Sequence, residues 1–217
     1  MPFTVEQFFD VFRRYNEAVW PAQIIAVIDA FIAIGAALHG GRRAGRLAVV
    51  VLAVLWLWMG TVYHLQFFRA INPAALAFGA AFVIQAALLI WFGVVRARLA
   101  FAPRLDVAGI AGGVLMVYAL AVYPEIGRAL GHSYPAAPTF GLPCPTTIFT
   151  FGLLLWAQPR VPLSVLVIPT AWAVIGSIAA VQLGVGEDAG LAVSAAVAIP
   201  LLVRHGRKLA PKPAHAA

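Results

Sequence analysis

The sequence is poor in charged residues and almost free of cysteine and lysine. Only 11% of the 217 residues are charged, whereas 63% are hydrophobic and the mean hydropathy is +0.92. A soluble domain carries about 25% charged residues, so this chain has too little polar surface to cover a globule in water. The one cysteine, Cys144, excludes an intrachain disulfide. The two lysines, Lys208 and Lys212, lie too near the carboxyl terminus for a retinal Schiff base within a helix bundle.

Several functional motifs are also missing from the sequence. It contains no phosphate-binding glycine loop, no GxSxG motif and no HExxH motif. The formal net charge of +7 is spread along the chain without a basic stripe or a nucleic-acid-binding motif, so no nucleic-acid partner is expected. A bis-histidine haem needs two histidines at one depth, and only His64 is well placed within an apolar segment, which argues against haem.

What the chain does have is a series of long apolar runs. A helix needs about 20 apolar residues to cross the hydrocarbon core of a bilayer. Seven segments approach this length, and one of them, 144–157, is short. The sequence therefore predicts an all-α, polytopic membrane bundle of seven transmembrane helices, at 19–38, 47–67, 74–95, 107–123, 144–157, 162–183 and 189–203.

The basic residues alternate with these apolar runs and predict an orientation. Lys and Arg accumulate on the cytoplasmic side of a membrane because they resist translocation. Four short segments between or after the apolar runs should lie on the same side of the membrane. Together they hold eleven of the fifteen basic residues: Arg42, Arg43, Arg46, Arg96, Arg98, Arg104, Arg160, Arg204, Arg207, Lys208 and Lys212. We therefore expect a protein of the bacterial inner membrane with a periplasmic amino terminus and a cytoplasmic carboxyl terminus. Its expected partner is the lipid bilayer, whose anionic headgroups attract basic side chains.

Residues 4–17 have the pattern of an amphipathic helix that is too polar to span a membrane. Thr4 and Gln7 form a capping-box signature at its start. Apolar residues follow helical spacing on one face, at Val5, Phe8, Phe9, Phe12 and Tyr15. The predicted organisation is an interfacial helix over 1–18, a seven-span membrane domain over 19–204, and a basic cytoplasmic tail over 205–217.

The sharpest local motif is Pro143-Cys144-Pro145-Thr146-Thr147. Pro145 suits the first position of a helix, so Cys144 would cap the short fifth span. A helix amino terminus favours a thiolate and attracts polar groups, and the hydroxyls of Thr146, Thr147 and Thr150 would extend such a site. The motif is equally typical of a proline-initiated helix with a small buried cysteine.

A metal site is a second hypothesis for the same end of the bundle. Four side chains with suitable donor atoms are expected on the outer side, namely His64, His132, Glu125 and Cys144. A thiolate, two imidazoles and a carboxylate would suit zinc or another soft divalent ion. None of these residues has the close spacing of a metal motif, and histidines near a membrane interface are ordinary anchoring residues.

Asp29 should lie near the middle of the first span. An ionisable group at that depth costs several kcal/mol unless it is paired, hydrated or protonated, so it marks a functional site by default. Gln85, near the middle of the third span, is its expected hydrogen-bond partner. Asp29 could carry protons or bind a cation or polar solute, or it could be a protonated group that joins two helices.

The stretch GHSYPAAPTFGLPCPTTIFTFG, from Gly131 to Gly152, resembles the signature of an uncharacterised family of bacterial seven-helix integral membrane proteins. The segments Tyr63-His64 and Ile71-Asn72-Pro73-Ala74-Ala75 are similar to the same family. The resemblance covers nearly the whole chain. It implies a bacterial multispan protein. Members of the family are sometimes labelled permeases but have no established activity.

The leading functional hypothesis is a small permease for a polar solute or a metal ion, acting alone or as a homo-oligomer. Its route would pass His64 and Cys144 and then Asp29 and Gln85 at the middle of the membrane. One alternative is a membrane-embedded enzyme that uses Cys144 or a metal at the outer face. The other is a non-catalytic partner or sensor subunit, which would lack a polar cavity.

Overall fold

The computed structural model describes residues 2–208, with side chains through Arg204, and six helices in this part are long and apolar enough to cross a membrane. They match six of the seven predicted spans. They consist of α2 (Ala22–His39), α3 (Gly41–Trp58) with η1 (Met59–Phe67) and η2 (Phe68–Ala70), α4 (Ala75–Leu89) with η3 (Ile90–Val95), α5 (Val107–Val117) with η4 (Tyr118–Val122) and α6 (Tyr123–Ala129), α8 (Leu163–Leu183), and η5 (Gly186–Asp188) with α9 (Ala189–Lys208). Lys212 and the rest of 209–217, in the predicted tail, lie outside the described residues.

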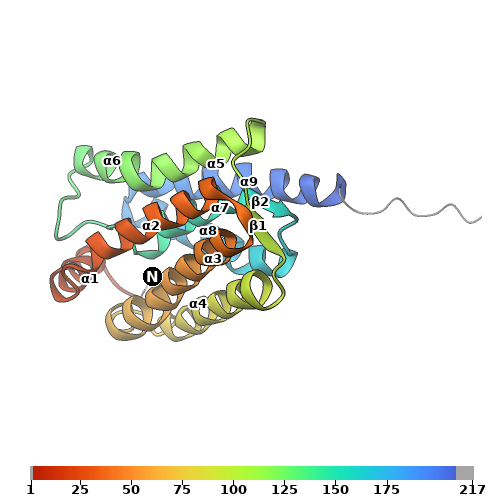
Figure 1. Ribbon diagram of the computed structural model, residues 1–217. Helices are drawn as coiled ribbons and strands as arrows, with labels where there is room; N and C mark the ends of the chain where they lie inside the picture. Colours follow the sequence, from red (N-terminus) through yellow and green to blue (C-terminus); the bar gives the residue numbers. More distant parts are fainter. Residues whose placement is uncertain (1, 209–217) are drawn as a thin grey trace, which may run out of the picture.

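The predicted fifth span is a short central helix, α7 (Pro143–Leu154). Its 12 residues rise about 18 Å, which is well below the ~30 Å thickness of a hydrocarbon core. Every residue of α7 except Cys144 is buried, and α5, α8 and α9 pack around it (Figure 1). The longer helices thus surround α7, and a helix enclosed in this way does not need the length of an apolar span.

Two glycines allow α7 to lie directly against α5. A Cβ at Gly152 would be 2.8 Å from the carbonyl oxygen of Gly112, and a Cβ at Gly112 would be 2.7 Å from that of Gly152. Any side chain at either position would therefore force the two backbones apart. Small residues serve the same purpose in membrane helix pairs generally.

A short two-stranded sheet closes the end of the bundle to which α7 leads. Strand β1 (Leu99–Phe101) pairs antiparallel with β2 (Ala157–Pro159), with Ala100 opposite Gln158. The start of α3 packs on this pair, because a Cβ at Gly45 would lie 3.3 Å from the Cα of Ala100. The pairing of β1 with β2 supplies backbone hydrogen bonds to the two non-helical connections that contain these strands.

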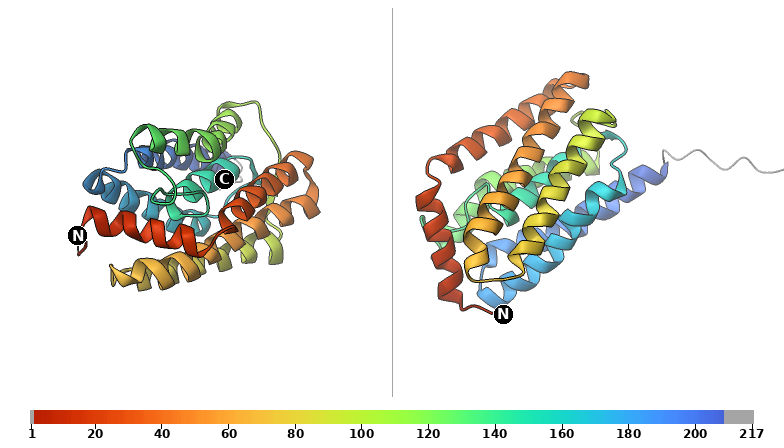
Figure 2. Two further views of the ribbon diagram at one scale, coloured as in Figure 1. Left: turned by 90° about the vertical axis from the view of Figure 1, so that its left-hand side faces the viewer. Right: turned by 90° about the horizontal axis from the view of Figure 1, so that it is seen from below.

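Helix α1 (Val5–Ala18) lies across the opposite end of the bundle, at a steep angle to the long helices (Figure 2). The predicted capping box is present, since the Thr4 hydroxyl accepts from the Gln7 N–H and the Gln7 side chain accepts from the Thr4 N–H. Four residues of its inner face are buried: Val11, Phe12, Tyr15 and Asn16.

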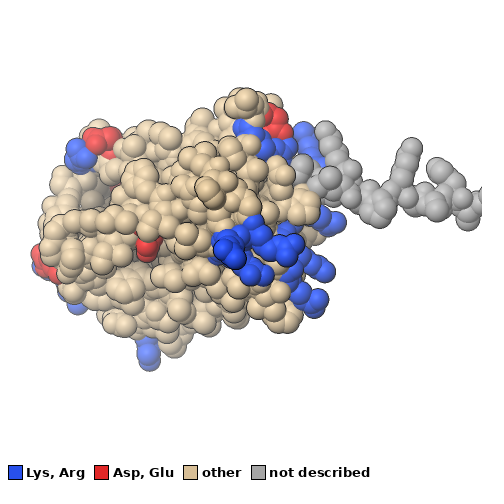
Figure 3. All heavy atoms as spheres, viewed as in Figure 1, with Lys and Arg blue, Asp and Glu red and all other residues tan. Residues whose placement is uncertain are grey.

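Charged side chains mark the two ends of the molecule differently. Most of the visible Lys and Arg side chains gather at the end that carries the β1–β2 pair, while acidic and basic residues are mixed at the end that carries α1 (Figure 3). Between the ends, the surface in this view is nearly free of charge. This division fits six apolar helices that run through a membrane.

Candidate functional site

The candidate site is built around two neighbouring acidic residues, Glu187 and Asp188. Charged residues between two apolar helices are usually solvated, yet Glu187 is fully buried and Asp188 is only 5% exposed. The reason lies in Gly184, whose φ of +74° ends α8 and turns the chain back. The following turn, η5, packs against α6, α8 and α9, so both carboxylates lie inside the bundle.

Two cavities adjoin η5, and each contains one of the two carboxylates. Cavity 1 has a volume of about 260 Å³ and is lined in part by Asp188, Cys144 and Trp172. Cavity 2 has a volume of about 420 Å³ and is lined in part by Glu187 and Tyr123. Consecutive residues therefore line different cavities, and η5 forms part of the wall between them.

Asp188 is held by hydrogen bonds from two other helices. The Tyr123 hydroxyl donates to Asp188 Oδ1 over 2.5 Å, and the Cys144 thiol is hydrogen-bonded to the same carboxyl group. Asp188 forms no ion pair with Lys or Arg among the side chains described through residue 204. Its carboxylate therefore has hydrogen-bond donors but no cationic partner.

Trp172 of α8 completes this polar corner of cavity 1. Its Nε1 atom and the Cys144 sulfur lie 3.5 Å and 3.6 Å from the point where Gly176 would carry a Cβ, and Leu191 Cδ2 lies 2.7 Å from the same point, so only glycine fits there. The indole N–H is hydrogen-bonded to the Cys144 sulfur, and Trp172 is only 9% exposed. Sulfur is a weak acceptor, so this corner is held together by one strong and two weak hydrogen bonds.

Glu187 is paired on the side of cavity 2. His132 Nδ1 lies 2.9 Å and 3.0 Å from the two carboxylate oxygens of Glu187. The Tyr118 hydroxyl donates to the backbone carbonyl of Glu187 over 2.7 Å. The His132 ring also packs on Phe9 of α1, with 4.6 Å between ring centroids. Glu187 is thus tied to the loop before α7 and, through His132, to α1.

The remaining wall of cavity 1 is mostly apolar and largely aromatic, with Asn72 as its one amide side chain among the described residues. Asp188 is the one charged side chain that the described residues contribute to the lining. Helix α1 covers this cavity, and η1, η2, α4 and α8 supply the other rings. The aromatic lining residues are Phe3, Phe8, Phe12, Tyr63, Phe68, Phe78 and Trp172.

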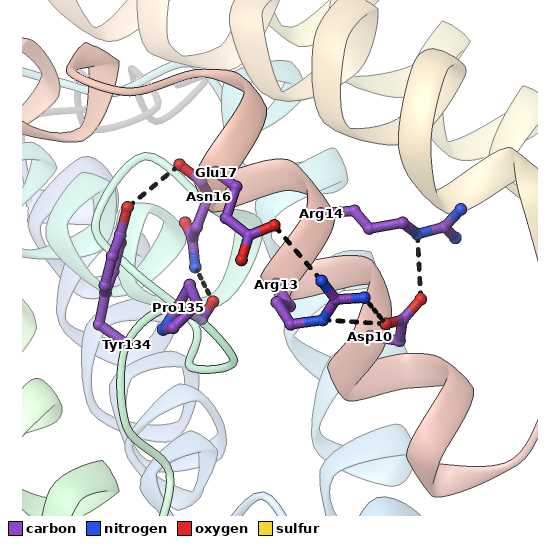
Figure 4. A network of polar contacts seen from close by, with 7 residues as sticks. All are labelled: Asp10, Arg13, Arg14, Asn16, Glu17, Tyr134 and Pro135. Carbon is purple, nitrogen blue, oxygen red and sulfur yellow. Dashed lines mark hydrogen bonds and ion pairs between the residues drawn. The ribbon is translucent and has the colours of Figure 1, made fainter.

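Asn16 anchors α1 over the cavities. Its Nδ2 atom donates to the carbonyl oxygens of Pro135 (2.7 Å) and Ala137 (2.8 Å), and its Oδ1 atom accepts from the Thr139 hydroxyl (2.8 Å). Figure 4 shows the amide pointing into the loop that carries Tyr134. Since Asn16 is fully buried, these bonds fix the position of α1 relative to the loop that leads into α7.

The outer face of α1 carries ion pairs, while its inner face carries a buried phenol. Asp10 pairs with Arg13 and Arg14, and the hydrogen bond from Arg13 lowers the pKa of Asp10 (Figure 4). These exposed pairs add little to stability. On the inner face, Trp58 Nε1 donates to the Tyr15 hydroxyl over 2.8 Å. Burial raises the pKa of Tyr15 to about 12, so it remains a neutral hydrogen-bond acceptor at neutral pH.

His64 lies behind cavity 1 rather than in an open site. It is fully buried, and neither ring nitrogen has a hydrogen-bond partner among the described residues. Its imidazole packs against the rings of Phe82 and Trp172, with centroid distances of 4.6 Å and 5.2 Å. The structure therefore places His64 next to a wall residue of cavity 1 and within an aromatic cluster.

The three predicted threonines have different roles. The hydroxyl of Thr146 accepts from the N–H of Gly141 over 3.1 Å, and that of Thr150 accepts from Trp56 Nε1 over 3.1 Å. Both fasten α7 to its surroundings. The hydroxyl of Thr147 is buried without a partner in the described part of the chain. None of the three lines cavity 1 or cavity 2.

Asp29 and Gln85 are not brought together, contrary to the sequence prediction. Gln85 Nε2 donates to the carbonyl oxygen of Val165 over 3.0 Å, so the amide joins α4 to α8. Asp29 lies on α2, is partly exposed, and lines neither cavity 1 nor cavity 2. Helix α2 packs chiefly on α3, and for this reason Asp29 does not reach α4.

The four predicted metal ligands are also separated. No group of three or more His, Cys, Asp and Glu side chains within the described residues could hold a metal ion. Glu125 is exposed and paired with Arg128, with 2.6 Å between Oε1 and the guanidinium nitrogen. His132 is occupied by Glu187, His64 is enclosed by aromatic rings, and Cys144 lies beside Asp188.

Cys144 could be predicted as a site residue from its local motif, but the residues around it could not. Tyr123 and Asp188 are 65 positions apart, and His132 and Glu187 are 55 positions apart, so neither pair can be recognised from a short sequence motif. A usable signal was present, because Glu187-Asp188 is the one place in the sequence where two acidic residues are adjacent.

Comparison with known proteins places the chain in a family. The model of a family described as "Family of unknown function (DUF6064)" matches residues 5–211, so the chain belongs to this family. No curated protein and no solved structure matches the chain. The family confirms that the resemblance is to an uncharacterised group, and it carries no support for the permease label.

Proposed function

We propose that this member of the DUF6064 family binds a small cation with an apolar body in cavity 1. The observation that supports this most directly is the carboxyl group of Asp188, the one charged side chain contributed to a mostly apolar and aromatic wall. An ionised carboxylate in such surroundings is costly without a counter-charge, and Asp188 has none from Lys or Arg in the described chain. A bound cation would supply that charge.

The aromatic wall favours the same class of ligand. The faces of aromatic rings attract cations, and seven aromatic residues line cavity 1. Their rings would also bury the apolar body of the ligand. An anion would be repelled by Asp188, and a strongly polar neutral solute would lose its hydration without enough hydrogen-bond partners in return.

We further propose that the bundle lies in the bacterial inner membrane with its amino terminus in the periplasm. The concentration of Arg side chains at the end with the β1–β2 pair supports this orientation, because positive charge accumulates on the cytoplasmic side. α7 would then act as a seventh, shortened crossing, and α1 would lie at the periplasmic interface. Cavity 1, which α1 covers, would open on that side.

Two other functions have less support. A permease for a polar solute or metal ion that uses Asp29 and Gln85 lacks a shared cavity, since Gln85 is bonded to Val165. An enzyme that uses Cys144 would need an electropositive setting for its thiol. Cys144 instead lies in an apolar wall beside the carboxyl group of Asp188.

The proposal is tested by binding measurements on the purified full-length protein in detergent or nanodiscs. Benzyltrimethylammonium and its neutral isostere neopentylbenzene have nearly the same shape and differ by one charge. The quaternary ammonium has no N–H to donate, so its contact with Asp188 is a charge–charge attraction of about 3 kcal/mol at ~5 Å and an effective dielectric constant of ~20, before desolvation is subtracted. We therefore expect calorimetry to show roughly 10- to 100-fold tighter binding of the cation.

Two variants decide which carboxyl group is responsible. Asp188→Asn keeps the shape of the side chain and should remove the preference for the cation. Asp29→Asn should retain it, because Asp29 lines neither cavity. Equal binding of the two probes by the unaltered protein, or an unchanged preference in Asp188→Asn, would contradict the proposal.

A further inference from the structure

The wall between the two cavities contains a direct hydrogen-bonded connection. Asp188 lines cavity 1, Tyr123 lines cavity 2, and the Tyr123 hydroxyl lies 2.5 Å from Asp188 Oδ1. We infer that a cation entering cavity 1 displaces one proton from Asp188, and that this proton leaves through the Tyr123 hydroxyl into cavity 2. The inference rests on the proposed function and adds to it an exchange of cation for proton.

When no cation occupies cavity 1, the Asp188 carboxyl group carries the proton that is later released. Asp188 has no ion pair with Lys or Arg in the described chain, and apart from Asn72, Tyr63, Cys144 and Trp172 the other residues that line cavity 1 are apolar. A carboxyl group in such surroundings favours its neutral form, because an unpaired buried charge is more costly than a buried neutral acid. Once a cation lies against the carboxyl group, the ionised form is favoured instead.

The transfer balances without any other reactant. In the neutral state, the Asp188 O–H must donate to the Tyr123 oxygen, with the phenol O–H turned towards cavity 2. The O–H bond of the Asp188 carboxyl group then breaks, its proton moves to the phenol oxygen, and the phenol's own proton passes to water on the side of cavity 2. The Tyr123 hydroxyl is left donating to the ionised Asp188 carboxylate, which is the direction seen in the structure. Tyr123 ends neutral, and the carboxylate charge is matched by the bound cation. A hydroxyl group can do this because it both donates and accepts a hydrogen bond.

The groups that face Asp188 single it out as the exchanging acid. Tyr123 faces it from α6, Cys144 from α7 and Tyr63 from η1, and all three are neutral in their ordinary protonation states. Glu187 precedes it in η5. His132, in the loop before α7, lies near both carboxyl groups and is hydrogen-bonded to Glu187. The neighbouring helix α8 contains no charged residue, and in α9 the charged residues lie at its far end, from Arg204 onward. Of the two adjacent acids, Asp188 is therefore the one that lines cavity 1 and is not bonded to the histidine.

Cavity 2 is suited to receive the proton. It is wide enough for several water molecules and is lined by polar residues that include Gln23, Arg128 and Thr139. The Oε1 atom of Gln23 has no hydrogen-bond partner among the described residues, although the residue is only 9% exposed. An unsatisfied acceptor at this wall is expected to bind water.

The exchange is measured by stopped-flow mixing of the full-length protein with benzyltrimethylammonium in weakly buffered solution containing a pH-sensitive dye. This probe carries no titratable proton, so any proton released comes from the protein. We expect about one proton per bound cation at a pH where Asp188 is protonated. Over that range the affinity should rise about tenfold per pH unit. Asp188→Asn should abolish both the release and the pH dependence.

The route is tested by a pair of matched tyrosine variants. Tyr123→Phe should keep cation binding but slow proton release by at least about tenfold, because a positioned proton donor is lost. Tyr118→Phe should leave the rate unchanged, since the Tyr118 hydroxyl bonds the Glu187 carbonyl rather than Asp188.

The outcomes separate this inference from the proposed function. Binding of the cation with no proton release would overturn the exchange and leave the proposed function standing. Proton release that is equally fast in Tyr123→Phe would overturn the route. A complete absence of cation binding would remove the proposed function and the exchange together.

Discussion

Helices α2 and α7 are both apolar, yet they occupy opposite environments. α2 has 18 residues, packs chiefly on α3, and exposes large side chains such as Ile25 (54%) and Phe31 (60%). α7 has 12 residues, packs on α5, α8 and α9, and buries all but Cys144. Apolar content alone therefore does not distinguish a lipid-facing helix from a central one.

The two helices also differ in the contacts that their polar side chains make. α7 is short enough to keep Cys144 at its amino end in contact with the carboxyl group of Asp188, and its threonine hydroxyls bond neighbouring segments. On α2, the Asp29 side chain forms no hydrogen bond or ion pair within the described residues and lies at the edge of the buried face. The central helix thus organises the polar interior, while the peripheral helix mainly covers it.

The strongest test of this comparison uses one glycine from each helix. Gly152→Ala on α7 would place a methyl group 2.8 Å from the Gly112 carbonyl oxygen, so we expect a loss of about 1–3 kcal/mol in the free energy of unfolding. Gly35→Ala on α2 meets nothing within 4 Å and should be neutral or stabilising by up to about 1 kcal/mol. Unfolding in detergent with increasing SDS measures both. Equal effects would show that α7 is not confined as the structure indicates.

A smaller effect is expected from the hydroxyl groups. Thr150→Val leaves the buried Trp56 indole N–H without its acceptor, and this should lower the free energy of unfolding by about 1–2 kcal/mol. Thr61→Val is the matched control, because the Thr61 hydroxyl bonds only the Leu57 carbonyl of its own helix, on the exposed side. The same SDS titration, read by tryptophan fluorescence, should show little change in the control. A similar loss in both variants would mean that the Thr150–Trp56 bond adds nothing.

The membrane-spanning helices could be predicted from the sequence, whereas the short elements could not. Each of the six long helices carries a sufficient apolar run, and hydropathy detects such runs directly. The segment 144–157 was predicted as one span, but its helix ends at Leu154 and Ala157 belongs to strand β2. Strands of three residues are too short to show an alternating pattern, so β1 and β2 gave no signal.

The candidate site depended on tertiary contacts that hydropathy does not report. Hydropathy left Glu187 and Asp188 between the spans predicted at 162–183 and 189–203, where charged residues are usually solvated. Their burial follows from Tyr123 and His132, which reach them from distant parts of the chain. For Asp29, depth in the apolar segment suggested a hydrogen bond to Gln85, whereas the Gln85 amide bonds the Val165 carbonyl and α2 packs chiefly on α3.

The smallest expected effect concerns Asp29. In Asp29→Leu the carboxyl group is replaced by an apolar side chain at the edge of a helix that already exposes isoleucine and phenylalanine. We expect the free energy of unfolding to change by no more than about 0.5 kcal/mol, as for most substitutions that break no buried contact. An increase in the free energy of unfolding would also agree with this expectation, because an acidic side chain is unfavourable within a membrane. A loss of more than about 1 kcal/mol would mean that Asp29 holds a partner through its carboxyl group. Such a result would make α2 a functional helix and would restore the role that its depth in the membrane first suggested.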